Sequence, residues 1–319
     1  MLAKDFLTLA EISPPHLQLL LSLSTKLKST RGKAGGSLLK GKSVALLFEK
    51  PSTRTRVSFQ LATSELGGFP IVLSANEIQL GRGETIEDTA RVLCRYVHVI
   101  MARVNLHEDV VRLARASSVP VINGLSDLYH PVQILADLLT LKEWKGTLKG
   151  LKVVWVGDGN NVCNSWMYGA ALSGVHFHVA TPPKYRPLGA AIKEARIIAK
   201  STGSTITITD DPEKAVSDAD CVITDTFVSM GFDRERDERI KAFLPKYQVN
   251  ARLMSHAKKN AVFEHCLPAH RGEEVTATVI DGRNSAVWDE AENRLHTTKA
   301  LLVYLLLGQR RVQNLLRGL

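Results

Sequence analysis

The chain of 319 residues is long enough for two domains, because the fraction of surface buried on folding rises with chain length. Hydrophobic residues make up 45% of the chain and charged residues 23%, which is typical of a folded globular protein and excludes a disordered one. The net charge of +9 favours acidic partners, but Lys and Arg are dispersed, which argues against nucleic-acid binding.

The sequence also indicates where the protein resides. No apolar stretch reaches the roughly 18 residues that a membrane span needs. The N-terminal sequence MLAKDFLTLAEIS has neither the long apolar core of a signal peptide nor the Arg-rich character of a transit peptide. Four cysteines lie far apart without a C-x-x-C pair: Cys94, Cys163, Cys221 and Cys266. We therefore expect a protein of the reducing cytoplasm that does not contact membranes.

In chain order, a helical segment at 12–29 precedes β-rich runs that alternate with helical patterns. The first four runs are SVALLFE (43–49), FPIVLS (69–74), VHVIMARV (97–104) and VPVING (119–124). A helix is predicted at 130–146, ending at Gly146. Five further runs follow: LKVVWVGD (151–158), VHFHVATP (175–182), STITITD (204–210), CVITDT (221–226) and AVFEHCL (261–267).

Strands separated by helices predict an α/β fold with parallel sheets. We place the domain boundary after the helix that ends at Gly146, so that the first domain covers 1–147 and the second covers 148–290. The segment 291–319 has helical spacing, and we expect it to pack back on the first domain.

The stretch FEKPSTRTRVSF (48–59) places hydroxyls and guanidiniums directly after a predicted buried strand. Pro51 favours a helix start, and Ser52 or Thr53 can cap the helix. The helix dipole, Arg54 and the hydroxyl of Thr55 all favour an anion, which predicts a phosphate site without a glycine loop. The alternative is a capped helix with solvated arginines.

In LYHPVQILADLL (128–139), His130 precedes a helix that starts at Pro131, and Gln133 lies one turn in. A neutral imidazole can donate an N–H to a carbonyl oxygen, and the carbonyl of Gln133 can accept from an NH₂ group. The alternative is a histidine that only packs at the helix entrance.

VWVGDGNNVCNS (154–165) invites a dinucleotide-binding interpretation through Gly157 and Gly159. Val162 stands where the third glycine or alanine belongs, and the next run ends in VATP without an acidic residue for a ribose. We therefore expect no NAD and no other cofactor. Asn160 and Asn161 instead offer amides suited to a small carboxylate or amine.

Two further runs end in groups that can carry chemistry. Asp225 in DTFVSMG (225–231) can hold an ammonium group, and the polar stretch after it suits a lid, although an ordinary exposed loop is the alternative. Cys266 in FEHCLPAHRGEEV (263–275) is a candidate nucleophile, ligand or packing residue. His265, Cys266 and His270 lack zinc-site spacing, so we expect no metal.

Taken in order, STRTR, ARV (102–104), HPVQ, GDGNN, DTFVSMG, HCLP and ENR (292–294) resemble the motifs of the ornithine carbamoyltransferases, within the aspartate/ornithine carbamoyltransferase family. The resemblance covers nearly the whole chain. It implies two α/β domains, each a parallel sheet flanked by helices, linked by interdomain helices, in a homotrimer with shared active sites. It also implies transfer of a carbamoyl group from carbamoyl phosphate to the δ-amine of L-ornithine, giving L-citrulline and phosphate in arginine biosynthesis.

By the same resemblance, one set of residues binds carbamoyl phosphate: Ser52, Thr53, Arg54, Thr55, Gln79 from a neighbouring subunit, Arg103, His130, Gln133, Cys266, Leu267 and Arg294. A second set binds ornithine: Asn161, Asp225, Ser229, Met230 and Cys266. The catalytic residues implied are Arg103, His130, Cys266 and Arg294.

The remaining alternatives concern the acceptor and turnover itself. A carbamoyltransferase acting on another amine, such as aspartate, putrescine or N-acetylornithine, is the nearest rival. Aspartate would call for cationic groups where this chain has Asp225 and the SMG stretch. A binding protein that kept the fold and lost activity is a rival of another class. Phe227, where relatives often have Trp, leaves the packing of the expected lid open.

Overall fold

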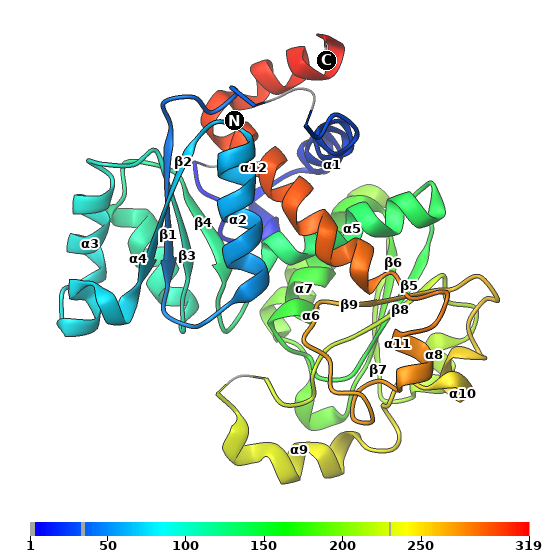
Figure 1. Ribbon diagram of the computed structural model, residues 1–319. Coiled ribbons are helices and arrows are strands. Elements are labelled where there is room, and N and C mark those ends of the chain that lie inside the picture. The colour runs from blue at the N-terminus through cyan, green and yellow to red at the C-terminus, as the bar shows by residue number, and fades with distance from the viewer. Residues whose placement is uncertain (1–3, 33–35, 230, 319) are drawn as a thin grey trace. The chain divides into compact units, whose positions relative to one another are not determined.

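The computed structural model describes residues 4–32, 36–229 and 231–318 and divides the chain into two compact units (Figure 1). Unit 1 comprises Met1–Leu139 with Glu292–Leu319, and unit 2 comprises Thr140–Ala291. Two helices, α5 (Pro131–Lys145) and α12 (Val287–Gly318), carry the chain across the unit boundaries. The limits that we drew from the sequence, at 147/148 and 290/291, stay predictions.

Unit 1 contains a four-stranded parallel sheet in the order β2-β1-β3-β4. Its strands are β1 (Ser43–Phe48), β2 (Phe69–Ser74), β3 (Val99–Arg103) and β4 (Val121–Leu125). Its helices before α5 are α1 (Pro14–Ser29), α2 (Thr53–Glu65), α3 (Ile86–Leu93) and α4 (His107–Ala116), with 3₁₀ turns η1 (Leu9–Glu11), η2 (Ala75–Glu77) and η3 (Gln79–Arg82). Helix α2 covers one face of the sheet, and α3 and α4 cover the other (Figure 1).

The central strands of unit 1 are apolar without alternation, because helices cover both faces of the sheet. Every residue of β3 is buried, as is β1 beyond Ser43. The edge strand β2 differs, since its first residue is exposed and the other five are half-buried. One side of this sheet therefore ends in a strand that the unit itself leaves only half covered.

Unit 2 contains a five-stranded parallel sheet in the order β7-β6-β5-β8-β9. Its strands are β5 (Lys152–Val156), β6 (His176–Ala180), β7 (Ile206–Thr209), β8 (Cys221–Thr224) and β9 (Val262–His265). Its helices are α6 (Asn161–Ser173), α7 (Gly189–Thr202), α8 (Pro212–Val216), α9 (Arg236–Phe243), α10 (Ala251–Met254) and α11 (Ala277–Ile280), with 3₁₀ turns η4 (Pro183–Tyr185) and η5 (Asp233–Glu235).

The expected α/β fold is confirmed: the nine strands found among the described residues coincide with the nine predicted runs, β4 extending one residue further to Leu125, and both sheets are parallel. Helix α5 ends one residue before Gly146, whose φ of 77° and N–H bond to the carbonyl of Lys142 (2.8 Å) close the helix as the sequence predicts. Helix α12 bends at Gly308, where φ is also positive (77°). The polar motifs therefore lie at the carboxyl ends of parallel strands, where α/β proteins bind ligands.

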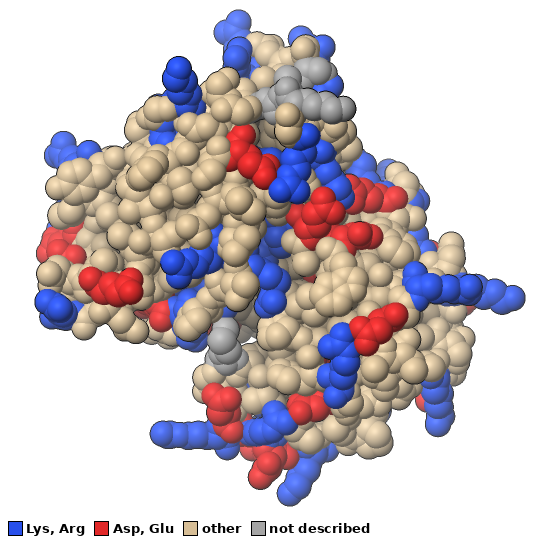
Figure 2. All heavy atoms as spheres, in the orientation of Figure 1, with Lys and Arg blue, Asp and Glu red and all other residues tan. Residues whose placement is uncertain are grey.

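The surface agrees with the composition. On the face shown in Figure 2, Lys and Arg are spread among Asp and Glu rather than gathered into one stripe. Within the ranges that the structure describes, no helix is both long enough and apolar enough to cross a membrane.

Candidate active site

The residues that follow β1 form a capped helix start. Ser52 is the N-cap of α2, and its Oγ accepts from the backbone N–H of Thr55 (3.3 Å). Pro51 precedes this cap instead of starting the helix, which begins at Thr53. The first turn carries a partial positive charge from the helix dipole, and Arg54 adds a guanidinium to it. This end of α2 can therefore hold an anion.

Arg103 ends the neighbouring strand. β3 pairs with β1 so that Arg103 lies opposite Phe48, and the N–H of Glu49 donates to the carbonyl of Arg103 (2.9 Å). The side chain of Arg103 is buried. The guanidinium-bearing residue Arg103 therefore lies at the carboxyl end of β3, beside the end of β1 from which the chain continues to Ser52.

Arg294 joins three helices of unit 1. Its guanidinium donates through Nη1 to Oε1 of Gln133, on α5, and through Nη2 to Oγ1 of Thr55, on α2 (3.2 Å). Nε2 of Gln133 donates in turn to Oδ1 of Asp137 (2.8 Å), which fixes the orientation of its amide. All four side chains are buried. Three motifs far apart in the sequence therefore meet in one cationic polar cluster.

His130 lies just before α5, and the N–H of Gln133 donates to its carbonyl (3.1 Å). Burial lowers the pKa of His130 well below its ordinary value, and the positive charges of Arg294, Arg103 and Arg54 lower it further. The imidazole is therefore neutral at physiological pH. A neutral imidazole can donate one N–H to a developing oxyanion. It carries no second, acidic proton that could be transferred to the phosphate.

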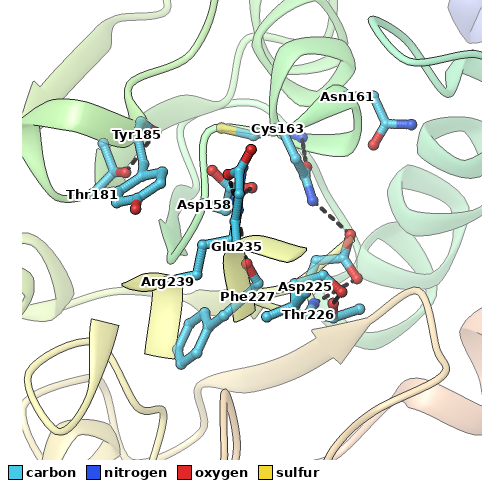
Figure 3. A network of polar contacts seen from close by, with 12 residues as sticks. Asp158, Asn161, Cys163, Thr181, Tyr185, Asp225, Thr226, Phe227, Glu235 and Arg239 are labelled. Atoms are coloured by element: carbon cyan, nitrogen blue, oxygen red, sulfur yellow. Dashed lines mark hydrogen bonds and ion pairs between the residues drawn. The ribbon is translucent and has the colours of Figure 1, made fainter. Parts of the chain in front are cut away.

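In unit 2, three adjacent strands β5, β8 and β9 bring a carboxylate, an amide and a thiol together. Asp225 follows β8, and its Oδ1 accepts from the N–H of Thr226 (2.8 Å) and from Sγ of Cys266 (3.2 Å). Its Oδ2 accepts from Nδ2 of Asn160 (2.7 Å), and Figure 3 shows this carboxylate below the start of α6. Asp225 is buried, and these donors satisfy both of its carboxylate oxygens.

The turn after β9 is held by a buried dyad. The N–H of Leu267 donates to Nδ1 of His265 (2.9 Å), so the ring proton sits on Nε2, which faces Oε1 of Glu274 (3.2 Å). The side chains of His265 and Glu274 are both fully buried. Leu267 has a φ of 57°, in the left-handed region that leucine rarely adopts, and the bond to His265 holds it there.

A second network ties the segment after Asp225 to the turn after β5 (Figure 3). Arg239, which is buried, donates to Oδ2 of Asp158 (2.9 Å), to the carbonyl of Phe227 (3.3 Å) and to Oε2 of Glu235 (3.0 Å). Its guanidinium also lies over the ring of Phe232, at 4.4 Å from the centroid. Arg239 thus contacts both ends of the stretch between residues 227 and 232.

Comparison with known proteins identifies this arrangement. Residues 4–143 match the family model described as the carbamoyl-P binding domain of aspartate/ornithine carbamoyltransferase, and residues 149–305 match its Asp/Orn binding domain. The chain belongs to the aspartate/ornithine carbamoyltransferase family.

Named relatives extend over nearly the whole chain. The ornithine carbamoyltransferase of Bacillus subtilis is 52% identical over 303 residues, which cover 95% of this chain and 94% of that protein. That of Carboxydothermus hydrogenoformans is 54% identical over 308 residues, covering 95% and 97%. The solved structure of ornithine carbamoyltransferase from Pyrococcus furiosus is 51% identical, covers 96% of this chain and 97% of that one, and gives a TM-score of 0.92.

The predicted site residues of this carbamoyltransferase fall into two groups, one in each unit. In unit 1, Thr55, Gln133 and Arg294 are in contact, and His130 lies within the electrostatic influence of Arg54, Arg103 and Arg294. The carbonyl of Gln133, which we expected to accept from a substrate NH₂ group, accepts from Arg294. Gln79 is exposed on η3, after the edge strand β2.

The predicted ornithine-binding residues of unit 2 are placed less uniformly. Asp225 and Cys266 are in contact, whereas Oδ1 of Asn161 accepts from the N–H of Val162 (3.0 Å), and Figure 3 shows its side chain apart from Asp225. Ser229 accepts from the N–H of Phe232 (3.0 Å) through its carbonyl. Met230 lies outside the described residues.

Gly159 of VGDGNN serves packing in this carbamoyltransferase. A Cβ on Gly159 would lie 2.3 Å from the backbone N of Pro187 and 2.6 Å from the carbonyl of Tyr185, so the residue must be glycine for the chain to pass here. The side chain of Val162 is buried. The close approach that a dinucleotide motif reserves for a pyrophosphate is taken here by residues 185–187.

Two groups of described side chains have the composition of a metal site, and His270, Glu273 and Glu274 form the second of them. Asp225, His265 and Cys266 offer ligand atoms within 4.8 Å of one another. Each of these side chains already has a protein partner: Cys266 donates to Asp225, and His265 is held between Leu267 and Glu274. The hydrogen-bond pattern therefore accounts for the cluster without an ion.

Three residues of the network in unit 2 were missed as site candidates: Asp158, Arg239 and Glu274. Arg239 lies in DRERDER and Glu274 in RGEEV, charged runs that look solvated in the sequence. Only the folded structure distinguishes these two residues from their charged neighbours, because it buries one charged side chain of each run.

Proposed function

We propose that this chain is an ornithine carbamoyltransferase, which transfers the carbamoyl group of carbamoyl phosphate to the δ-amine of L-ornithine and releases L-citrulline and phosphate. The observation that carries the proposal is the buried cluster of Thr55, Gln133 and Arg294 beside His130, because it gathers donors from three motifs at the anion-binding end of α2. The names of the relatives above support the same activity.

The leaving group sets the demands on unit 1. The phosphate of carbamoyl phosphate binds at the first turn of α2, held by Ser52, Thr53, Arg54 and Thr55 with help from Arg103. A dianion suits a helix N-terminus flanked by two guanidiniums. The same groups stabilise the charge that the phosphate gains as it departs.

The carbonyl group requires a preformed set of donors. Arg103, His130 and Thr55 face the carbonyl oxygen, which becomes negative as the amine attacks. Oε1 of Gln133, which Arg294 orients by donating to it, accepts from the carbamoyl NH₂ through its second lone pair. The neutral state of His130 fits this role, since it leaves one ring N–H to donate and no mobile positive charge.

The amino acid binds at the carboxyl ends of β8 and β9. Asp225 pairs with the α-ammonium group, aided by Asn161, Ser229 and Met230, and Cys266 lies near the δ-amine. A buried carboxylate suits an ammonium group and repels the β-carboxylate of aspartate, which favours ornithine over that acceptor.

The reaction itself is a direct transfer. The neutral δ-amine attacks the carbonyl carbon, a C–N bond forms, and the bond from carbon to the bridging phosphate oxygen breaks. The attacking nitrogen loses one proton, and the departing phosphate takes it up. No covalent enzyme intermediate is needed, so Cys266 orients the amine instead of acting as a nucleophile. We propose that carbamoyl phosphate binds first.

We further propose a homotrimer in which Gln79 reaches the active site of a neighbouring copy. Unit 1 exposes apolar side chains along α2 and at the start of β2: Val57 (47%), Leu61 (42%) and Phe69 (67%). Such a surface is typical of an interface between subunits. Light scattering of the purified protein tests this, and a monomeric mass would rule out the shared site.

The cellular role follows from the activity. We propose that the enzyme works in arginine biosynthesis in the cytoplasm. Its four cysteines are all free thiols, which suits a reducing compartment. A strain that lacks ornithine carbamoyltransferase and requires arginine tests this role, because expression of the chain should restore growth without arginine.

The activity is tested by measuring citrulline formed from carbamoyl phosphate and each of four acceptors: L-ornithine, N-acetylornithine, putrescine and L-aspartate. We expect ornithine to be used with the highest kcat/KM. Arg54→Ala should raise the KM for carbamoyl phosphate at least tenfold, since it removes a charged contact with the phosphate. Arg56→Ala, an exposed neighbour on the same helix, is the matched control. Product formation only from another amine would refute the proposal.

A further inference from the structure

Asn160 uses the two ends of one side chain for two different purposes. Its Oδ1 caps α6 by accepting from the backbone N–H groups of Val162 (3.0 Å) and Cys163 (3.1 Å). Its Nδ2 donates to Oδ2 of Asp225 (2.7 Å). The two helix donors fix which end of the amide is oxygen, so the end that faces Asp225 is the NH₂ group.

The carboxylate of Asp225 is framed on both oxygens. Thr226 and Cys266 donate to Oδ1, and Asn160 donates to Oδ2. The bond from Thr226 comes from the adjacent backbone and the one from Cys266 from a weakly donating thiol. The 2.7 Å bond from Asn160 is therefore the strongest constraint from outside the β8 turn on where this carboxylate points.

The chemistry of the donor matters as much as its position. A neutral amide orients a carboxylate without neutralising it, so the negative charge remains available to an incoming ammonium group. A lysine or arginine at position 160 would form an ion pair and use up that charge. An aspartate would place a second carboxylate against Oδ2, which repels the first and offers it no N–H donor.

We propose that Asn160 is the positioning residue for Asp225, and that it adapts the start of α6 to the recognition of the amino-acid substrate's α-ammonium group. This inference rests on the proposed function, because it concerns the ornithine half of that reaction. Asn160 affects substrate binding only through its hydrogen bond to Asp225. We expect no contact between Asn160 and the carbamoyl group.

Two substitutions separate the helix-capping role of Asn160 from its role as a hydrogen-bond donor to Asp225. Asn160→Asp keeps an acceptor for the two N–H groups of α6, because aspartate caps helices as well as asparagine does, but it loses the NH₂ donor. Asn160→Ser keeps a shorter cap and adds no charge. Asn250→Asp is the matched control, since Asn250 caps α10 by accepting from the N–H of Leu253 (3.0 Å) in the same unit.

The measurement is steady-state kinetics with each substrate varied in turn, together with the inhibition constant of L-norvaline, which keeps the α-amino and α-carboxylate groups of ornithine and lacks the δ-amine. A hydrogen bond to a charged group contributes enough to change binding about 10- to 100-fold. We expect both Asn160 variants to raise the KM for ornithine and the inhibition constant of norvaline by that factor. The KM for carbamoyl phosphate should stay within about twofold of its original value, as should all constants of Asn250→Asp.

Each other outcome counts against the inference. An unchanged ornithine KM in Asn160→Asp would show that Asp225 needs no help from Asn160. Equal losses for both substrates, or a matching loss in Asn250→Asp, would show that the residue acts only as a helix cap. Failure of the unsubstituted protein to use ornithine would instead refute the proposed function, so the two failures are distinguishable.

Discussion

The buried pair of Arg239 and Asp158 gives a sharp test of what holds unit 2 together. The exposed fraction of the side chain is 7% for Arg239 and 11% for Asp158, and their atoms are 2.9 Å apart. Replacing Arg239 by Met keeps most of the apolar stem and removes the guanidinium. Asp158 would then remain buried without the cation that compensates its charge.

The size of the effect can be worked out from the contacts. Breaking a buried pair from one side costs about 3–5 kcal/mol. The bond to Glu235 adds little, because that carboxylate is half exposed at 48%. Loss of the guanidinium from the rings of Phe232 and Tyr185 adds about 0.5–1 kcal/mol each, partly offset by contacts of the new Met. We expect a loss of about 4 kcal/mol, which lowers Tm by about 8–16 °C in a domain of this size.

The pH dependence identifies the cause. Burial raises the pKa of Asp158 to about 6, although Arg239 opposes this. Removing Arg239 raises it further, so the carboxyl group of the variant is protonated and neutral in mildly acidic solution. The destabilisation by Arg239→Met should therefore be smaller at pH 5 than at pH 8.

Thermal and urea unfolding of Arg239→Met, Asp158→Asn and the double variant forms the assay. The double variant should be more stable than Arg239→Met alone, because it contains no uncompensated charge. A loss below about 1 kcal/mol in Arg239→Met, or a double variant whose loss equals the sum of the two single losses, would refute the reasoning.

Two further predictions concern unit 1 and the turn after β5. Because burial and three neighbouring guanidiniums lower the pKa of His130, the unfolded chain takes up a proton before the folded one as pH falls through about 6.5, so stability decreases below that pH. In unfolding experiments His130→Asn should reduce this slope, and an unchanged slope would contradict the assignment. Gly159→Ala should destabilise the protein by about 1–3 kcal/mol, since its Cβ would meet the backbone of residues 185–187. Gly189→Ala, whose Cβ has no neighbour within 4 Å, should be neutral or slightly stabilising, and equal melting temperatures of the two variants would contradict the packing argument.

The sequence was sufficient for the fold because its signals are local. Apolar runs of six to eight residues alternate with helical patterns, and a fully buried strand such as β3 has no polar residue to obscure it before Arg103. The cap at Ser52 and the end of α5 at Gly146 are equally local. Such features are encoded within one turn of chain.

The candidate site was predictable only in part, because its contacts are not local. The motifs supplied Thr55, Gln133 and Arg294, but no local pattern shows that the carbonyl of Gln133 faces Arg294. Asn160 and Asn161 are adjacent and chemically identical, and only the direction of the chain into α6 turns the first toward Asp225. Tertiary structure decided between them.

The order of synthesis gives the cluster around Arg294 a further consequence. Thr55 and Gln133 are translated before unit 2, whereas Arg294 is translated only after all of it. All strands of the unit 1 sheet are therefore translated before the guanidinium that joins α2 to α5. The groups that would bind a reactive acyl phosphate are thus completed only after unit 2 has been made.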